Sequence, residues 1–187
     1  MAAEPPTPVH RFSLEEYHRL IEAGGFDEDA RIELIDGLLV DMSPKSPAHE
    51  NAIAWLNQLL VLSVDLDRFE VRVTAALTTG TSEPEPDIIV IERDAPRPYH
   101  PGTAALIIEV AVSSQARDLR HKPPIYAGAG VPDYWVVDLD GGRVVVHGSP
   151  RDGAYGRTEI VGAGGELVAS CLDLPPISVA ELLAAAG

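Results

Sequence analysis

The chain has 187 residues, enough for one well-cored domain, and its hydrophobic content of 45% is ordinary for a globular protein. No apolar run approaches the roughly 20 residues of a membrane span, and the single cysteine excludes an internal disulfide or a cysteine-rich zinc cluster. The net charge of −15 argues against an extended nucleic-acid-binding surface, because such surfaces draw on clusters of Lys and Arg. The amino terminus lacks the apolar segment of a secretory signal, which favours the cytoplasm.

The amino-terminal part of the chain predicts a tail and a short helix. Residues 1–10 are proline-rich and are expected to be loose, whereas residues 11–187 are expected to form a single domain. Ser13 and Glu16 have the spacing of a capping box, which marks the start of a helix. This helix is predicted over about 14–23, where two glycines end it.

A β-hairpin is predicted next. Asp36 and Gly37 both tolerate positive φ and stand between two alternating apolar runs, which predicts strands at about 31–35 and 38–42. Glu33 lies on the first of these strands. It is interpreted either as a solvated carboxylate at a sheet edge or as part of a polar site.

A longer helix is predicted over about 47–63, because Ile53, Leu56 and Leu60 recur at helical spacing. His49 lies one turn before Ile53 and shares its inward face. A lone histidine in this place serves either as a core or capping residue or as part of a functional site.

Two apolar strands each carry one carboxylate. A strand predicted at about 87–92 begins with Asp87, and a later apolar run contains Glu109. A carboxylate within a run of Ile and Val costs free energy unless it has a partner or a cation. If the two strands pair, the carboxylates converge at one end of the sheet. Two carboxylates and a backbone carbonyl are sufficient protein ligands for a hard divalent ion such as Mg²⁺.

The carboxyl-terminal half predicts a helix interrupted near Pro123 and Pro124, and then a hairpin that turns at 140–142. Three later elements are predicted, namely strands at about 155–161 and 166–170, which extend the sheet, and a capped helix at about 179–185.

Other side chains are interpreted as packing residues. Tyr134 and Trp135 alternate on an apolar strand and are expected to pack against the sheet rather than to stack on nucleic-acid bases. Cys171 is expected to be a small buried side chain. The order of the elements predicts an α+β (mixed α/β) domain around one curved sheet.

A series of motifs runs along most of the chain, from about residue 13 to the carboxyl terminus. The motifs are ELIDG (33–37), Pro47 to His49, EPDIIVI (85–91), IIEVAVSS (107–114), Asp118 with Lys122 and Tyr126, and AGVPDYWVVD (129–138). Taken in order, this series resembles the Uma-type restriction endonuclease family of the PD-(D/E)XK nuclease superfamily. The resemblance implies a restriction-endonuclease-like domain, a curved mixed β-sheet flanked by helices.

The resemblance also implies roles for individual residues. Asp87 and Glu109 match the two metal-binding carboxylates of the superfamily motif. The lysine of that motif would stand at Ala111, and Lys122 matches the lysine that this family carries on the following helix. Glu33 matches an acidic residue of the family's first hairpin and is expected to complete the site.

Four further residues bear on the position of the lysine and on the limits of the site. Pro123 and Pro124 directly follow Lys122, and they either displace it from the site or lie in the first turn of a restarted helix. Gln115 is a candidate to compensate for a displaced lysine, because it lies nearer the end of the strand. His49 falls on a recurring position of the family.

The function implied by the resemblance is a Mg²⁺-dependent (or Mn²⁺-dependent) endonuclease that hydrolyses DNA phosphodiester bonds with a metal-activated water. The alternative is a binding or regulatory module that keeps the nuclease fold without the activity. RNA or a branched structure is a third candidate substrate. A homodimer is expected because most oligomers are symmetric, with the hairpin near 31–42 and the late strands as candidate contact edges, and no membrane partner is expected.

Overall fold

The structure is a computed structural model, and it describes residues 9–187 apart from positions 28, 98 and 113–114 and the side chains of positions 115 and 116. Most of the predicted tail therefore lies outside the described residues. None of the helices in the described part of the chain has the length and apolar character of a membrane span.

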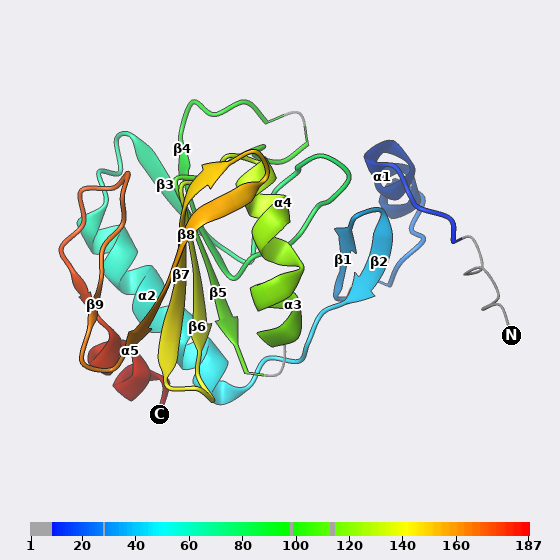
Figure 1. The fold of residues 1–187 in the computed structure, drawn as a ribbon. Coiled ribbons are helices and arrows are strands. Elements are labelled where there is room, and N and C mark those ends of the chain that lie inside the picture. Colours follow the sequence, from blue (N-terminus) through cyan, green and yellow to red (C-terminus); the bar gives the residue numbers. More distant parts are fainter. Residues whose placement is uncertain (1–8, 28, 98, 113–114) are drawn as a thin grey trace, which may run out of the picture.

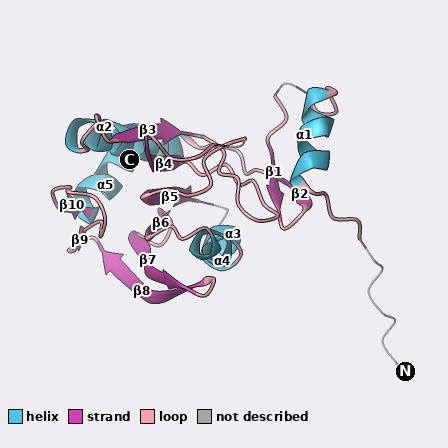
Figure 2. Ribbon diagram, turned by 90° about the horizontal axis from the view of Figure 1, so that it is seen from above, coloured by secondary structure: helices cyan, strands magenta, loops and turns pink. Residues whose placement is uncertain are grey.

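A mixed β-sheet forms the centre of the molecule. Its strands are β3 (Phe69–Val73), β4 (Ile88–Glu92), β5 (Leu106–Ala111), β6 (Asp133–Asp138), β7 (Arg143–Arg151) and β8 (Ala154–Gly162). They lie side by side in this order, and β5 and β6 are parallel whereas the other neighbours are antiparallel. The sheet is curved (Figure 2), which confirms the predicted α+β class with a curved mixed sheet.

Helices cover both faces of this sheet (Figure 1). One face carries α2 (Pro47–Ser63) and α5 (Val179–Ala186), and the other carries α3 (Gln115–Arg120) and α4 (Lys122–Gly128). Side chains along β5 alternate between the two layers, because Ile108 packs in the α2 and α5 layer whereas Ile107 and Ala111 pack in the α4 layer. Glu109 stands between Ile107 and Ala111 in this alternation, so it faces α3 and α4.

The long helix α2 has the bounds predicted from its periodicity. The Ser46 hydroxyl accepts the backbone N–H of His49 at 3.3 Å, which caps the first turn. Ile53, Leu56 and Leu60 are buried against the sheet. The first turn of α2 therefore holds His49 in a fixed position at the edge of the core.

The amino-terminal elements lie to one side of the sheet (Figure 1). They are α1 (Leu14–Glu22), β1 (Ile32–Ile35) and β2 (Leu38–Asp41). The capping box of α1 and the hairpin are both confirmed. The turn between β1 and β2 needs Asp36 at φ 49° and Gly37 at φ 77°. A Cβ atom on Gly37 would also lie 2.9 Å from the carbonyl oxygen of Phe12, so the turn needs glycine there.

Backbone hydrogen bonds attach this hairpin to the rest of the molecule. Leu34 and Glu83 exchange two of them, at 2.7 and 3.3 Å. The backbone N–H of Asp36 also donates to the Ser82 hydroxyl at 2.8 Å. The segment before β4 thus extends the hairpin and fixes its position relative to the sheet.

Two predictions for the carboxyl-terminal part are wrong. The strand predicted at 166–170 does not extend the main sheet, because β9 (Glu166–Leu167) pairs with β10 (Ile177–Ser178) in a separate two-stranded sheet. The chain reverses after β8, where Gly165 N–H donates to the carbonyl of Gly162 at 2.9 Å. Cys171 is exposed rather than buried. Tyr134 and Trp135 are both fully buried, on opposite faces of the sheet, as predicted for packing residues.

Candidate active site

The register of β4 and β5 brings Asp87 and Glu109 together. The strands are antiparallel, and Ile88 stands opposite Ile108, so one further step brings Asp87 opposite Glu109. The Val110 N–H donates a hydrogen bond of 2.8 Å to Oδ2 of Asp87, which fixes this carboxylate against β5. The two carboxylates therefore lie at one end of the sheet, as predicted from the sequence.

His49 supports Asp87 from the other side. Its Nε2 lies 3.1 Å from Oδ2 of Asp87, and the ring is buried. Since a carboxylate accepts, we assign the Nε2–H tautomer, in which the histidine donates. The other oxygen of Asp87 accepts no hydrogen bond from the part of the chain that the structure describes. His49 thus serves both as a residue of the capped first turn and as a partner of the site.

Lys122 lies among three carboxylates. Its Nζ is 2.8 Å from Oε1 of Glu109, 3.2 Å from Oε2 of Glu33 and 3.6 Å from Oδ1 of Asp118. The lysine is only 3% exposed. The ammonium group and the three carboxylates thus compensate one another's buried charges, and the ammonium group is held beside Glu109.

The two prolines do not displace Lys122. The helix breaks at His121, one residue before the lysine, and Lys122 is the first residue of α4. Pro123 and Pro124 follow in the first turn, where backbone N–H groups have no acceptor within the helix, so the prolines cost no hydrogen bond. Of the two alternatives that the sequence leaves open, the restarted helix is the observed arrangement. The side chain of Gln115, the candidate substitute, lies outside the described residues.

Glu33 is part of this cluster and is not a solvated edge carboxylate. It is 1% exposed, and its Oε2 accepts the backbone N–H of Glu85 at 3.2 Å. Its Oε1 lies 3.3 Å from a guanidinium nitrogen of Arg117. The hairpin therefore adds a buried carboxylate to the site formed by the sheet and α4.

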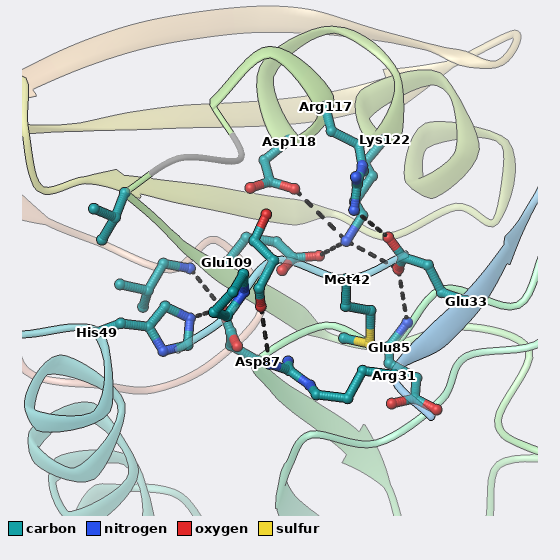
Figure 3. Close-up of a pocket in the computed structure, with 14 residues that line it drawn as sticks. Arg31, Glu33, Met42, His49, Glu85, Asp87, Glu109, Arg117, Asp118 and Lys122 are labelled. Atoms are coloured by element: carbon teal, nitrogen blue, oxygen red, sulfur yellow. Dashed lines mark hydrogen bonds and ion pairs between the residues drawn. The ribbon is translucent and has the colours of Figure 1, made fainter. Parts of the chain in front are cut away.

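These side chains line a small cavity (Figure 3). Its lining residues are Arg31, Glu33, Met42, Ser43, Pro44, His49, Glu85, Asp87, Glu109, Val110, Val112, Arg117, Asp118 and Lys122. The volume is about 50 Å³, enough for an ion with a few waters, since one water needs roughly 10–15 Å³. It is too small for a nucleotide base. Five carboxyl groups face three basic side chains in this lining, so the cavity favours a cation.

Burial and charge shift the proton equilibria of the site. Burial raises the pKa of Glu109 well above its ordinary value, the ammonium group of Lys122 opposes this, and the neighbouring carboxylates add to it. Burial alone would lower the pKa of Lys122, but the charges of Glu109, Glu33 and Asp118 raise it. Burial also raises the pKa of Glu85, and the charge of Glu33 adds to that shift. Lys122 is therefore a protonated cation at neutral pH.

The donor chemistry of the cavity fits a hard divalent cation. Asp87 and Glu109 offer carboxylate oxygens on adjacent strands, and the surplus of acidic groups would be offset by a positive ion. Within the described residues, no three His, Cys, Asp or Glu side chains are grouped so that they could hold a metal ion. Two carboxylates are a donor set that a hard divalent cation can use, because such an ion keeps several of its waters.

The sequence places Tyr126 in the motif series but indicates no role for it, and the series does not include Arg31 or Arg117. Tyr126 donates its hydroxyl proton to Oε1 of Glu109 at 2.9 Å, and its position four residues after Lys122 on one helix face is consistent with this contact. Arg31 stands two residues before Glu33 in the chain, and this shared strand face pointed to it. Arg117 had no local signal, because its contact with Glu33 depends on the position of the hairpin.

Comparison with known proteins identifies the family. The family model named Uma2, described as "Putative restriction endonuclease", matches residues 14–184. The chain belongs to the Uma2 family. This confirms the resemblance inferred from the motifs, and it extends over α1, the hairpin, the sheet and α5.

One solved structure supports the fold of this Uma2 protein. A protein of Anabaena variabilis ATCC 29413, described as "a putative nuclease belonging to DUF820", has 16% sequence identity and a TM-score of 0.76 over 94% of this chain and 99% of its own. This likeness confirms the restriction-endonuclease-like fold. The type IIG restriction endonuclease BpuSI has 18% identity and a TM-score of 0.39 over 81% of this chain and 17% of its own, which is too low to support an argument. No curated protein matches the sequence.

Proposed function

We propose that this Uma2 protein is an endonuclease that hydrolyses DNA phosphodiester bonds with Mg²⁺ or Mn²⁺ as its cofactor. One observation carries the proposal, namely that Asp87, directly before β4, stands beside Glu109 of β5 while Nζ of Lys122 lies 2.8 Å from Glu109. Two adjacent carboxylates with a lysine are the elements that metal-assisted hydrolysis needs. Membership of the Uma2 family supports the same reaction class.

Asp87 and Glu109 would hold the metal ion, together with a backbone carbonyl. When bound, a divalent ion activates water and stabilises the charge that develops on the phosphodiester. Val110 and His49 both donate to the same oxygen of Asp87, which orients the other oxygen of this carboxylate as a ligand. Tyr126 similarly restrains Glu109 through its hydroxyl group.

Lys122 would act as a cation and not as a general base, because the surrounding carboxylates raise its pKa. Its ammonium group can donate a hydrogen bond to the attacking water and offset negative charge in the transition state. Glu33 and Asp118 keep the ammonium group in position. The role of Glu33 is therefore to position the lysine.

DNA would reach the site through its backbone. The cavity is too small for a base, so only a phosphate would approach it, and the guanidinium groups of Arg31 and Arg117 lie in its lining. Because the whole chain carries a net charge of −15, we expect DNA affinity to be weak and to depend on the bound cation.

A plasmid-nicking assay tests the proposal. Purified protein is incubated with supercoiled DNA in Mg²⁺, Mn²⁺ or EDTA, and the wild type is expected to cut only with metal. Asp87→Asn and Glu109→Gln are expected to abolish cutting, whereas Glu92→Gln, on exposed β4 surface, should retain it. Thermal melting of each variant shows that the fold is kept.

The alternative function is a binding module without catalytic activity, which the net charge of −15 favours. Linear, branched and single-stranded DNA and RNA are therefore included as substrates. Failure to cut any of them with either metal, together with Mn²⁺ binding that is unchanged in Asp87→Asn, would exclude the nuclease and leave the binding module. Cutting of RNA or branched DNA alone would instead redefine the substrate.

A further inference from the structure

Strand β8 is an open edge of the main sheet. It pairs with β7 on one side and forms the end of the strand order, so no strand of the described residues lies on its other side (Figure 2). With nine residues it is long for an edge strand, and it contains neither proline nor lysine. Edge strands that stay monomeric are usually short or carry such residues, because their free N–H and C=O groups otherwise pair with another strand.

The middle of β8 is exposed over five consecutive residues, 156–160. Ile160 is 61% exposed, although it is a large apolar side chain on a strand. An isolated exposed isoleucine is unremarkable, but here it lies on an open edge with free backbone groups. Pairing with a further strand would remove both the Ile160 side chain and the free backbone groups of the edge from water.

The sequence of β8 is complementary to itself about Thr158. In an antiparallel pair of two copies centred on this residue, Arg157 of each copy stands opposite Glu159 of the other. Ile160 stands opposite Gly156, which leaves room for the larger side chain. Opposite charges directly across an antiparallel pair are stabilising, whereas a pair centred on Arg157 or Glu159 would place like charges in contact. Charge therefore selects the register centred on Thr158.

The charges of β8 are only loosely paired within the subunit. Arg157 lies 3.7 Å from Glu159 and 3.9 Å from Asp133, both longer than a hydrogen bond, and the Arg157 and Glu159 side chains are 47% and 58% exposed. They remain available to a second copy.

The opposite edge of the sheet, β3, differs in this respect. There Glu70 and Arg72 are 2.7 Å apart, and Arg97 also binds Glu70 at 3.1 Å. These charges already have close partners within the subunit. We therefore expect association with another strand at β8 and not at β3, and variants on β3 serve as controls for variants on β8.

We propose that two copies of this chain associate through β8, in an antiparallel pair centred on Thr158 that joins their six-stranded sheets. This association does not depend on the nuclease reaction, because β6 and β7 separate β8 from the strands that carry Asp87 and Glu109. The partner is a second copy of the chain, since the complementarity is between β8 and itself.

Charge exchange tests the register. The wild type is expected to sediment with twice the 20.0 kDa mass of the chain. Arg157→Glu or Glu159→Arg alone places like charges opposite each other in both halves of the pair, and each should raise the dimer dissociation constant on the order of tenfold or more. The double variant R157E/E159R restores opposite charges and should restore the dimer. Arg68→Glu, an exposed charge change away from β8, should leave the mass unchanged.

Cross-linking provides a second, independent test. Thr158→Cys in a Cys171→Ser background should form a disulfide between subunits on mild oxidation, because facing Cα atoms in an antiparallel pair are about 4.5–5.5 Å apart. Val73→Cys in the same background, on the β3 edge, should not. A wild-type protein that stays monomeric at all concentrations overturns the proposal. So does a dimer whose mass neither single charge change alters.

Discussion

His49 and Val110 donate hydrogen bonds to the same carboxylate oxygen of Asp87, at 3.1 and 2.8 Å. One donor comes from the first turn of α2 and the other from the backbone of β5, so two elements of the core determine the orientation of a single buried carboxylate. The arrangement resembles the outer-shell support of a metal ligand, in which a neighbouring donor fixes the direction of the oxygen that binds.

Replacing His49 with alanine should weaken metal binding without removing either carboxylate. Loss of an outer-shell partner typically lowers metal affinity by about 10- to 100-fold. We expect a decrease of this size in Mn²⁺ affinity, measured by isothermal titration calorimetry at one pH. Glu50→Ala, at the adjacent exposed position of α2, should bind Mn²⁺ like the wild type. Equal affinities for the two variants would show that the His49 ring does not support metal binding.

Lys122→Met should destabilise the protein as well as reduce cutting. The change leaves Glu33 and Glu109 buried without their cation, and breaking a buried ion pair in this way costs about 3–5 kcal/mol. Urea unfolding in EDTA measures the free energy of unfolding directly. Lys45→Met removes the other lysine, which binds the Thr74 hydroxyl at 2.9 Å, and should cost less than about 1.5 kcal/mol. A small effect at Lys122 would mean that the carboxylates are not charged in the folded protein.

Tyr126→Phe should lower the free energy of unfolding by about 1.5–3 kcal/mol, because it removes a buried hydrogen bond to a carboxylate while the ring keeps its place against Tyr134. Activity should fall as well, since Glu109 loses one of its two restraints. Urea unfolding and the nicking assay give the two readouts. Tyr99→Phe, at an exposed tyrosine, is the matched control and should change neither. Unchanged stability at Tyr126 would exclude a contribution of this hydroxyl group.

His147 should make the protein less stable in mild acid. Burial lowers its pKa below the ordinary 6.5, because the ring packs against Tyr134 and its Nε2 has no hydrogen-bond partner in the described structure. The unfolded chain therefore binds the proton more readily. The contribution of His147 to stability is complete above pH 6.5 and is lost as the pH falls through the lowered value.

Melting temperatures between pH 7.5 and 5 measure this effect, with pH values chosen to span the ordinary histidine range of about 6.5. His147→Phe keeps an aromatic ring and should reduce the decrease in Tm on acidification, whereas His10→Gln, at an exposed position, should not. An identical decrease in the wild type and in His147→Phe would assign the acid sensitivity to other groups.

Local signals in the sequence were sufficient for most elements. The Asp36-Gly37 turn, the Ser13 cap and the periodicity of α2 each depend on neighbouring residues, and each element has close to its predicted bounds. The error at 166–170 has a different origin, because an apolar run of this length does not specify which strand it pairs with. Cys171 was misplaced because a residue type alone does not determine burial on a short connecting segment.

The parts of the site that depend on strand register were predictable from the sequence. The parts that depend on how the β1–β2 hairpin packs against the rest of the fold were not. Asp87 and Glu109 converge because two apolar strands pair, and the sequence indicated both strands. The burial of Glu33 and its contact with Arg117 arise only when the hairpin packs beside α3, which no local pattern indicates. Lys122 was ambiguous for the same reason, because the break at His121 determines where α4 begins.

Because Glu33 lies on the hairpin, the cavity can open without unfolding of the central sheet. The strands of the hairpin have four residues each and form their own two-stranded sheet, which is marginally stable alone. Local unfolding of this unit would need less free energy than global unfolding, and it would expose Lys122 to solvent while the central sheet persists. Amide protons of β1 and β2 should therefore exchange through a low-energy opening that those of β5 do not share.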